Sequence, residues 1–600
     1  MSNTRNIPCS SKHPIQPPTQ SVTLYRAIGG STFQNILVAK RRGFSPIMLL
    51  WCILLGFALV VFWRDATQSQ GMLLLLNYSL PLGVIQRLVP LAALAIGGIG
   101  FAAIVQATGP AVHAADLPGL VTYHWRGAIW STIGIGIAGA MAVVWVLHAF
   151  PNSGDEYDYL FEAKTFLAGR LWNPIPSLFD LFAYHHILFK DGKWIAGYPP
   201  GWPLLLAATM GARAPPWLAC PLAGALLLFA MFKLGQLRDG ALGGVLAVAL
   251  VALSPFFLFS AGSYFDLVPA AAAGSLFCWA ALKFLRQPRL ANAAASGLAL
   301  GALGLIRNQD VLLFALPFAA EFLWKAGLRH YRLTPIIVLA GLPFLVALLL
   351  YYNTALGSPV PQTNLESQTV RFGLFPIDEF GRYLTPLDEL RFVMGRIIML
   401  GEWTSPLLVL GYLVAFGLLA VRHRLSFLDF IFPAYVLAFM LVPFDGGNQY
   451  GPRYYFEAFP FLVLTVVSGL VPLLHEIKRP RQVAFYTSLV LAHGAISIAG
   501  TAIFAVAMRT IVDQRMDIYD QVRAKRLRNA VVVVHSGTSP LRLMDPRDLT
   551  RNGIAVGEQV IYVLDIPDRL MSLHRLFPAR RFYIYERAPR SPKGRLRPLS

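Results

Sequence analysis

The sequence has little charge for its size: Asp, Glu, Lys and Arg make up 14% of its 600 residues, whereas hydrophobic residues make up 56%. Ordinary water-soluble domains carry about a quarter of charged residues, so this composition and a mean hydropathy of +0.55 exclude a chain built from them. Cysteine is also scarce. The four cysteines form no CxxC pair, and the sequence therefore predicts neither a disulfide framework nor a cysteine metal site.

Signals for nucleotides, nucleic acids and secretion are missing as well. There is no P-loop and no convincing GxGxxG fingerprint, so ATP or a nucleotide-sugar donor is not indicated. The net charge of +20 does not indicate nucleic-acid binding, because the basic residues lie mostly between apolar runs or in the last hundred residues. The polar, Pro-rich start of the chain lacks a cleavable apolar core, and residues 1–45 are predicted to be a disordered cytoplasmic tail.

Long apolar runs take up most of the chain. A helix needs about 20 apolar residues to cross the hydrocarbon core of a bilayer. About thirteen runs approach this length, which predicts an all-α polytopic membrane protein. The predicted spans are 46–63, 88–107, 128–149, 216–236, 241–258, 267–285, 291–306, 311–326, 334–352, 405–421, 427–443, 458–475 and 483–507.

Lys and Arg in the short loops predict the orientation of these spans in a cell (inner) membrane. If the N-terminus is cytoplasmic, strict alternation places every basic short loop on the cytoplasmic side. The loops 150–202 and 353–404, the turns 259–266, 307–310 and 444–457, and the tail after about 508 then lie outside. The cytoplasmic basic groups are Lys40, Arg41 and Arg42; Arg126; Lys233 and Arg238; Lys283, Arg286 and Arg289; Lys325, Arg329 and Arg332; Arg422 and Arg424; and Lys478, Arg479 and Arg481.

The last hundred residues differ from the membrane part. Residues 530–535, 560–565 and 581–585 are predicted as strands, and 572–577 as a helix. Residues 508–600 are therefore expected to form a small extracytoplasmic α/β domain.

Two adjacent acids, Asp155 and Glu156, begin the first external loop directly after an apolar run. If Asp155 starts a helix, Asp158 and Glu162 share its polar face, while its apolar face can lie on the membrane surface, as in an interfacial amphipathic helix. Ser153 and Glu156 also match a capping box, in which Glu156 would be structural. Asp155 is the stronger catalytic candidate because it stands where the chain leaves the membrane.

Isolated ionisable residues occupy the other external turns. They are Asp266 in SYFDLVP, Arg307 and Asp310 in IRNQD, and Arg453 in YGPRYYFE. Charges at membrane depth are costly and are usually functional or paired. One alone would indicate an ion pair, whereas several on one side predict a shared polar pocket. The motif YPPGWP, which starts at Tyr198, predicts a stiff extended entry into an apolar helix.

Taken in order, these features resemble the polyprenyl-phosphate-dependent membrane glycosyltransferases of the GT-C fold. Within that family, the sequence resembles the bacterial branch that is related to protein mannosyltransferases, the lipid A aminoarabinose transferase and the rhizobial galacturonosyl transferases. The resemblance is carried by the acidic pair, YPP followed by PLLLA, Asp266, IRNQD, YYNTALGSP and GPRYYFEAFPFL, and it covers 128–475. It implies a GT-C-like catalytic domain over 128–507, preceded by an extra pair of spans over 46–127.

The resemblance also implies roles for individual residues. Asp155 resembles the general base that takes a proton from the acceptor hydroxyl, with Glu156 in the partner position. Asp266 resembles the second acid of the site. Arg307 and Arg453 are implied to hold the donor's phosphate.

One departure from the resemblance concerns the phosphate contact. Several relatives have Lys before the double proline, where this chain has Tyr198. The contact is therefore expected from Lys193, His185 or His186. Asp310, close to Arg307 in the IRNQD turn, is expected to line the same substrate site.

The expected activity is transfer of a sugar from a polyprenyl-phosphate donor to a hydroxyl on a glycan, lipid or protein, with inversion and on the extracytoplasmic side. A divalent metal bridging Asp155 and Asp266 is an open alternative that acids alone do not establish. The competing class is a transporter or flippase of a lipid-linked intermediate. Such proteins have midplane sites on broken helices and often an internal repeat, and the sequence shows neither. An inactive relative of the enzymes is the third alternative.

Overall fold

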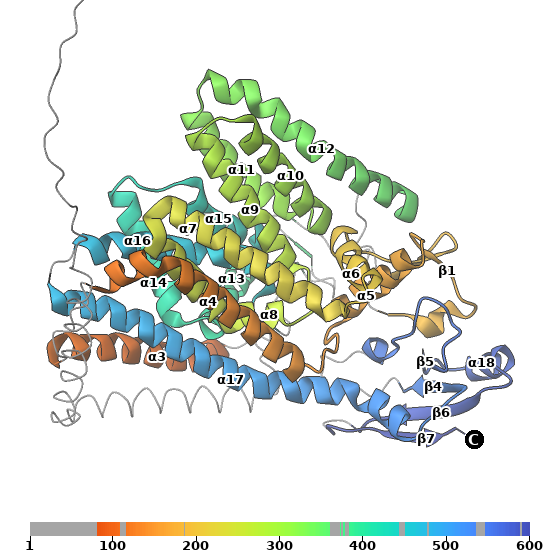
Figure 1. The fold of residues 1–600 in the computed structure, drawn as a ribbon. Coiled ribbons are helices and arrows are strands. Elements are labelled where there is room, and N and C mark those ends of the chain that lie inside the picture. The colour runs from red at the N-terminus through yellow and green to blue at the C-terminus, as the bar shows by residue number, and fades with distance from the viewer. Residues whose placement is uncertain are drawn as a thin grey trace, which may run out of the picture.

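The computed structural model describes residues 81–108, 116–184, 186–359, 373, 376–377, 383–442, 450–476, 479–535, 546–588 and 591–599. The predicted tail 1–45, the predicted span 46–63 and His185 lie outside these residues. The described chain is a bundle of helices with a small sheet at one end (Figure 1).

The longer helices are α3 (Pro81–Thr108), α4 (Asp116–Val146), α5 (Gly154–Leu167), α6 (Gly201–Gly211), α7 (Ala219–Ala252), α8 (Pro255–Ala261), α9 (Leu267–Arg286), α10 (Leu290–Ile306), α11 (Asp310–Lys325), α12 (Leu328–Leu356), α13 (Pro386–Trp403), α14 (Pro406–Val421), α15 (Phe427–Ala438), α16 (Phe459–Glu476) and α17 (Pro480–Ala524).

Six of the described helices are long and apolar enough to cross a membrane, or seven if the bent pair α13 and α14 forms one span. Three shorter apolar helices, Leu91–Ala107, Leu290–Ile306 and Phe427–Leu441, fall below that length. The chain is thus a multi-pass membrane protein, but the predicted count of about thirteen spans is not confirmed. The sequence estimate is higher because it accepted shorter runs, included 46–63 and divided α7 in two.

Helix α7 reverses its direction at Asp239 and Gly240. Gly240 has φ +76° and ψ −170°, a conformation that glycine adopts without steric cost. A Cβ added to Gly235 would lie 2.7 Å from the carbonyl oxygen of Gly243, although eight residues of straight helix span about 12 Å. Residues 216–236 and 241–252 therefore run as two antiparallel arms, in the places where the sequence predicts two separate spans.

The bundle has two chemically different ends. Helix α9 starts next to Asp266 and ends at Arg286, and α11 starts at Asp310 and ends at Lys325. The acids thus lie at one end of these helices and the bases at the other. In Figure 1 the helices α5 and α6 and the C-terminal sheet share one end of the bundle.

The first loop is folded into a compact unit around α5. Strands β1 (Asn173–Pro174), β2 (Ile187–Lys190) and β3 (Lys193–Ala196) pair in the order β1-β3-β2, all antiparallel. The predicted polar face of α5 is not exposed as an interfacial amphipathic helix requires, because Asp158 and Glu162 are buried in protein, whereas Leu167 of the predicted apolar face is 50% exposed. Phe161 packs on Trp194 at 4.9 Å between ring centroids, and the carboxylate of buried Glu162 accepts a hydrogen bond from Tyr351 at 2.6 Å.

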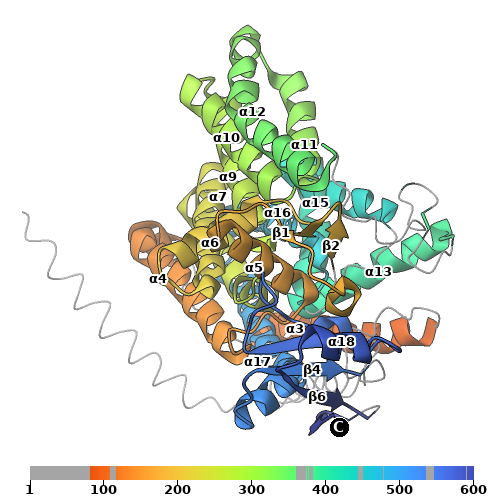
Figure 2. The same cartoon turned by 90° about the vertical axis from the view of Figure 1, so that its right-hand side faces the viewer.

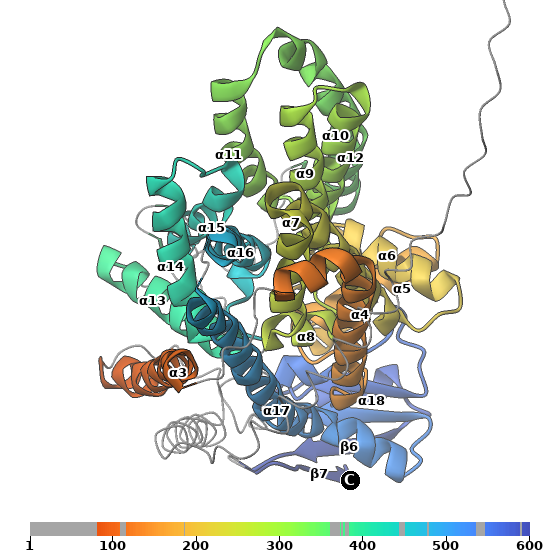
Figure 3. The ribbon, with the colours of Figure 1, turned by 60° about the vertical axis from the view of Figure 1, so that its left-hand side comes forward.

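The C-terminal domain contains a four-stranded sheet in the order β5-β4-β6-β7 (Figure 1). Strands β4 (Ala530–Val534), β5 (Val560–Leu564) and β6 (Arg581–Glu586) and helix α18 (Leu570–Leu576) confirm the elements predicted there, and β7 (Arg595–Pro598) adds an antiparallel edge. In Figure 2 the strands β4 and β6 lie beside α18 at the foot of the molecule. Helix α17 has 45 residues, about 68 Å, which is roughly twice the hydrocarbon thickness. It therefore continues from the bundle into this domain (Figure 3).

The C-terminal domain is docked on the segment that precedes α5. Arg551 donates a hydrogen bond to the carbonyl of Pro151, and its guanidinium lies 4.6 Å from the ring centre of Phe150. Arg515 donates to Asn152 Oδ1 at 3.0 Å. These buried contacts fix the point at which the chain leaves the bundle and enters α5.

Candidate active site

Asp155 is held by residues from three distant parts of the chain. Its Oδ2 accepts a hydrogen bond from the Arg453 guanidinium at 2.6 Å, and its Oδ1 accepts one from the Tyr198 hydroxyl. His186 Nε2 lies 3.5 Å from the same Oδ1. The side chain of Asp155 remains 19% exposed and that of Arg453 15% exposed, so the pair is open to a small ligand.

These neighbours keep Asp155 ionised. Burial raises the pKa of Asp155, but the charges of Arg453 and His186 and the hydrogen bonds from Tyr198 and Arg453 outweigh it. The pKa therefore lies well below its ordinary value. A carboxylate in this state accepts hydrogen bonds strongly, but it is a weak base for as long as Arg453 neutralises it.

Glu156 has a different environment from its neighbour Asp155. The backbone N–H of Glu156 donates to Ser153 Oγ at 3.1 Å, and its carboxylate accepts from the N–H of Ser153 at 3.2 Å, which completes the capping box of α5. Its other oxygen accepts from the backbone N–H of Tyr264 at 2.9 Å. Glu156 is fully buried and joins the start of α5 to the turn that carries Asp266, which is a positioning contact.

Glu156 gives this region a pH dependence that can be measured. Burial raises its pKa to about 7, against an ordinary value of 4.5, although the hydrogen bond from Tyr264 opposes the shift. The folded state then binds more protons than the unfolded state between these two values, so stability falls as pH rises through about 4.5 to 7, by roughly 3 kcal/mol for one group. We expect Glu156→Gln, which keeps the cap, to flatten this slope in thermal unfolding measured from pH 5 to 8. An unchanged slope would show that Glu156 is ionised throughout that range.

A second cluster surrounds Arg307. Its guanidinium lies 3.0 Å from Asp266 Oδ1, 3.0 Å from Asp310 Oδ2 and 3.2 Å from Glu457 Oε1. Each of these residues is at most 8% exposed. One arginine thus faces three carboxylates in a region that water hardly reaches.

Three ionised carboxylates around one cation would leave an excess of buried negative charge. Burial raises the pKa of Asp266 and that of Glu457 above their ordinary values, although Arg307 opposes both shifts. The cluster is therefore expected to hold at least one shared proton at neutral pH. Arg307 is occupied by these partners, so of the two predicted phosphate-binding arginines Arg453 is the one placed beside Asp155.

Tyr159 connects the two clusters. It lies on α5 one turn after Asp155, and its ring centroid is 4.6 Å from that of Tyr198. Its hydroxyl is near enough to Asp266 to lower the pKa of that carboxyl, against the effect of burial. The predicted convergence of Asp155 and Asp266 therefore runs through a tyrosine to which the sequence analysis gave no role.

The YPPGWP motif brings the turns of the site together. A Cβ added to Gly201 would lie 2.6 Å from the carbonyl oxygen of Leu305, so only glycine lets α6 approach the turn that carries Arg307. Trp202 Nε1 donates to the carbonyl of Tyr264 at 2.7 Å, next to Asp266. The motif is thus more than an entry into a helix, because it fixes the distances between three segments.

Substitution of Gly201 tests this close approach. We expect Gly201→Ala to destabilise the protein by about 1–3 kcal/mol, because the new methyl group meets backbone atoms that cannot move away cheaply. Gly211→Ala in the same helix is the matched control, since its Cβ would meet Leu167 at an ordinary 3.6 Å. In thermal unfolding measured in detergent, Gly201→Ala should unfold at a lower temperature than Gly211→Ala. Equal stability of the two variants would contradict the close approach.

The remaining predicted site residues lie in different places. Lys193 Nζ donates to the carbonyl of Thr354 at 2.7 Å and lies 4.5 Å from the ring centre of Trp172, so it caps the end of α12. His186 is beside Asp155 and is 40% exposed, which makes it the better placed of the predicted phosphate contacts. His185 lies outside the described residues.

Asp155 and Asp266 are each paired with an arginine, and this arrangement does not fit a metal bridging them. Among the described residues, no group of three or more His, Cys, Asp or Glu side chains is arranged to hold a metal ion.

No protein-family model matches the sequence, and no curated protein matches it. Among solved structures, ArnT from Cupriavidus metallidurans bound to undecaprenyl phosphate aligns over 76% of this chain and 93% of its own, at 12% identity and a TM-score of 0.48. The Archaeoglobus fulgidus oligosaccharyltransferase in its apo form aligns over 69% of this chain and 62% of its own, at 11% identity and a TM-score of 0.39. The mycobacterial arabinofuranosyltransferase AftD aligns over 76% and 35%, at 15% identity and a TM-score of 0.37. These proteins are GT-C glycosyltransferases, the class that the sequence resembles, but at such values the likeness assigns neither a substrate nor a residue role.

Proposed function

We propose that this chain is an integral membrane glycosyltransferase that moves a sugar from a polyprenyl-phosphate donor to a hydroxyl acceptor. The observation that carries the proposal is the pair of Asp155 and Arg453. A carboxylate and a guanidinium that are 298 residues apart in the chain meet at one end of an apolar bundle, and both remain partly exposed. Transfer from a lipid phosphate needs a cation at the leaving phosphate and a carboxylate at the acceptor hydroxyl, within one site.

Arg453 is the group proposed to bind the donor's phosphate. As the bond between the sugar C1 and the phosphate oxygen breaks, positive charge develops on the sugar and the phosphate leaves with the bonding electrons. A guanidinium binds a phosphate in a bidentate manner and stabilises this leaving group. Arg453 also lies 4.8 Å from the ring centre of Phe265, which fixes its plane.

Asp155 is the proposed general base. It takes the proton of the acceptor hydroxyl while the oxygen attacks C1 from the face opposite the phosphate, which gives inversion in a single displacement. Tyr198 orients the carboxylate through its hydrogen bond, and His186 Nε2 lies 3.5 Å from the same oxygen.

Donor binding and base strength are coupled in this proposal. While Arg453 is paired with Asp155, the carboxylate is a poor base. A bound phosphate competes for the guanidinium, so the pKa of Asp155 rises and the carboxylate becomes a better base. The acceptor hydroxyl is then activated only when a donor is present.

The proposed side of the membrane is the extracytoplasmic one. The basic loops and the acidic site lie at opposite ends of α9 and α11, and cytoplasmic loops carry the excess of Lys and Arg. This arrangement supports a cytoplasmic N-terminus and an external C-terminal domain.

The test begins in cells, because the sugar and the acceptor are both to be identified. Mass analysis of lipids and glycans from cells with and without the protein should show a donor that accumulates and a product that is lost. Purified protein in liposomes with that donor and acceptor should then release free polyprenyl phosphate and form the product. Movement of the intact donor between leaflets, without release of polyprenyl phosphate, would contradict the proposal and support the flippase alternative.

A further inference from the structure

A cavity of about 320 Å³ lies at the end of the bundle opposite Asp155. Five basic side chains line it, from α7, α9 and α11 and from the turn before α15: Arg238, Arg286, Lys325, His423 and Arg424. Helix α9 runs from the candidate active site to this cavity, which places the two about 30 Å apart. The cavity is therefore separate from the site described above.

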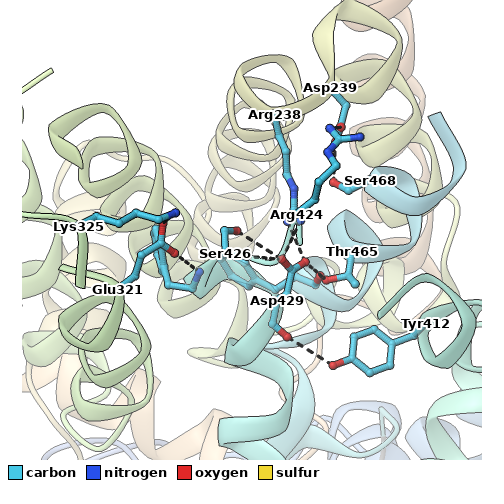
Figure 4. A network of polar contacts seen from close by, with 12 residues as sticks. Arg238, Asp239, Glu321, Lys325, Tyr412, Arg424, Ser426, Asp429, Thr465 and Ser468 are labelled. Atoms are coloured by element: carbon cyan, nitrogen blue, oxygen red, sulfur yellow. Dashed lines mark hydrogen bonds and ion pairs between the residues drawn. The ribbon is translucent and has the colours of Figure 1, made fainter. Parts of the chain in front are cut away.

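The floor of this basic pocket is a fixed and neutral ion pair. Arg238 donates two hydrogen bonds to Asp429, at 2.8 and 2.7 Å, and Asp429 is fully buried (Figure 4). Asp429 also accepts hydrogen bonds from the backbone N–H of Ser426 and from the hydroxyl of Thr465, both at 2.8 Å. This pair holds α7, α15 and α16 together and is not free to bind a ligand.

Three other cations at the pocket are held loosely. Arg424 lies 3.5 Å from Asp239 and its side chain is 44% exposed. Lys325 lies 2.8 Å from Glu321 and is 54% exposed. Arg286 is exposed and donates to a backbone carbonyl, that of Leu237, at 2.7 Å. Lys325 and Arg286 can turn toward an anion without breaking a buried ion pair, whereas Arg424 can face an anion only while it stays near Asp239, whose side chain is 1% exposed.

The charges around the pocket do not cancel. Four permanent cations face the carboxylates of Glu321, Asp239 and Asp429, so one positive charge is left over. Glu321 also accepts a hydrogen bond from the backbone N–H of Phe427, the first residue of α15. Part of the negative charge of Glu321 is therefore offset by this N–H group. An anion is therefore the ligand that the pocket attracts.

Four leucines, Leu282, Leu285, Leu425 and Leu428, share the lining with Glu321 and Ser426. Basic side chains beside leucines, at the end of membrane-spanning helices, match an amphiphile that has a phosphate and apolar chains. We propose that this pocket binds the phosphodiester headgroup of an anionic phospholipid. The proposal stands on this end of the bundle alone and does not depend on the glycosyltransferase assignment.

The test compares lipid retention by the full-length protein. Wild type purified from liposomes of phosphatidylglycerol and phosphatidylcholine should keep phosphatidylglycerol in native mass spectrometry. The double variant R286Q/R424Q should reduce this retention about thirtyfold, since each Lys or Arg near the surface contributes about 1 kcal/mol to the attraction of anionic lipid. R286K/R424K should retain the lipid, which separates loss of charge from loss of folding.

The matched control removes two charges from the same end of the bundle but outside the pocket. Arg329 and Arg332 at the start of α12 are exposed, and R329Q/R332Q should retain phosphatidylglycerol like wild type. Inorganic phosphate serves as the probe for a free anion. Equal retention by wild type and R286Q/R424Q, an equal loss in the control, or displacement of the lipid by millimolar phosphate would overturn the proposal.

Discussion

Replacement of Asp155 by Asn is expected to lower kcat for sugar transfer by about 10²–10⁴-fold, the usual contribution of a general base. Asn keeps the size of the side chain but cannot take the acceptor's proton. The KM for the donor should not rise, because Arg453 loses its carboxylate partner and remains available to the phosphate. The measurement is the rate of polyprenyl phosphate release from purified protein in liposomes.

The control for this substitution is Asp180→Asn in the same loop. Asp180 pairs with Arg569 of the C-terminal domain at 3.0 Å and is 31% exposed. An exposed ion pair of this kind contributes little, so transfer should stay within about twofold of wild type. Transfer above about a tenth of the wild-type rate in Asp155→Asn would remove Asp155 as the base.

Replacement of Arg307 by Gln is expected to destabilise the fold by about 3–5 kcal/mol. Removing one partner of a buried ion pair leaves the other charges uncompensated, and here Asp266, Asp310 and Glu457 lose their common cation. The loss should be larger at pH 8 than at pH 5. The reason is that the pKa of each carboxyl is raised in the folded state, so its protonated form is favoured at low pH and stability is lost as pH rises.

Arg391→Gln provides the comparison for Arg307→Gln. Arg391 pairs with Asp388 at 3.1 Å on α13 and its side chain is 45% exposed, so less than about 1 kcal/mol should be lost in thermal unfolding. If Arg307→Gln unfolded like wild type but bound the donor poorly, Arg307 would be a phosphate ligand, as the sequence resemblance implies, and not a structural centre.

Local signals in the sequence predict many elements well. Continuous runs of β-branched and other apolar residues locate β4 and β5, because a parallel strand buried on both faces has no polar alternation. Ser153 and Glu156 place the start of α5 because a capping box has a fixed spacing. The meeting of Asp155 with Arg453 follows from a second kind of signal, the assignment of both turns to one side of the membrane.

Contacts between distant segments are less visible in the sequence. The approach of Gly201 to Leu305 and that of Tyr159 to Asp266 have no local signature, because spacing within a helix does not say which turn it meets. Glu457 did have a signal, since an acid in an apolar segment is seldom without a role. Lys193 was misleading because a lysine near a loop end can cap a helix as well as bind a phosphate.

The most direct measurement is a structure of the protein in lipid nanodiscs with a polyprenyl phosphate bound. We expect a phosphate oxygen about 2.7–3.0 Å from the Arg453 guanidinium, and Asp155 displaced from its present contact with that guanidinium. A phosphate bound away from Arg453, with the pair of Arg453 and Asp155 intact, would contradict this expectation.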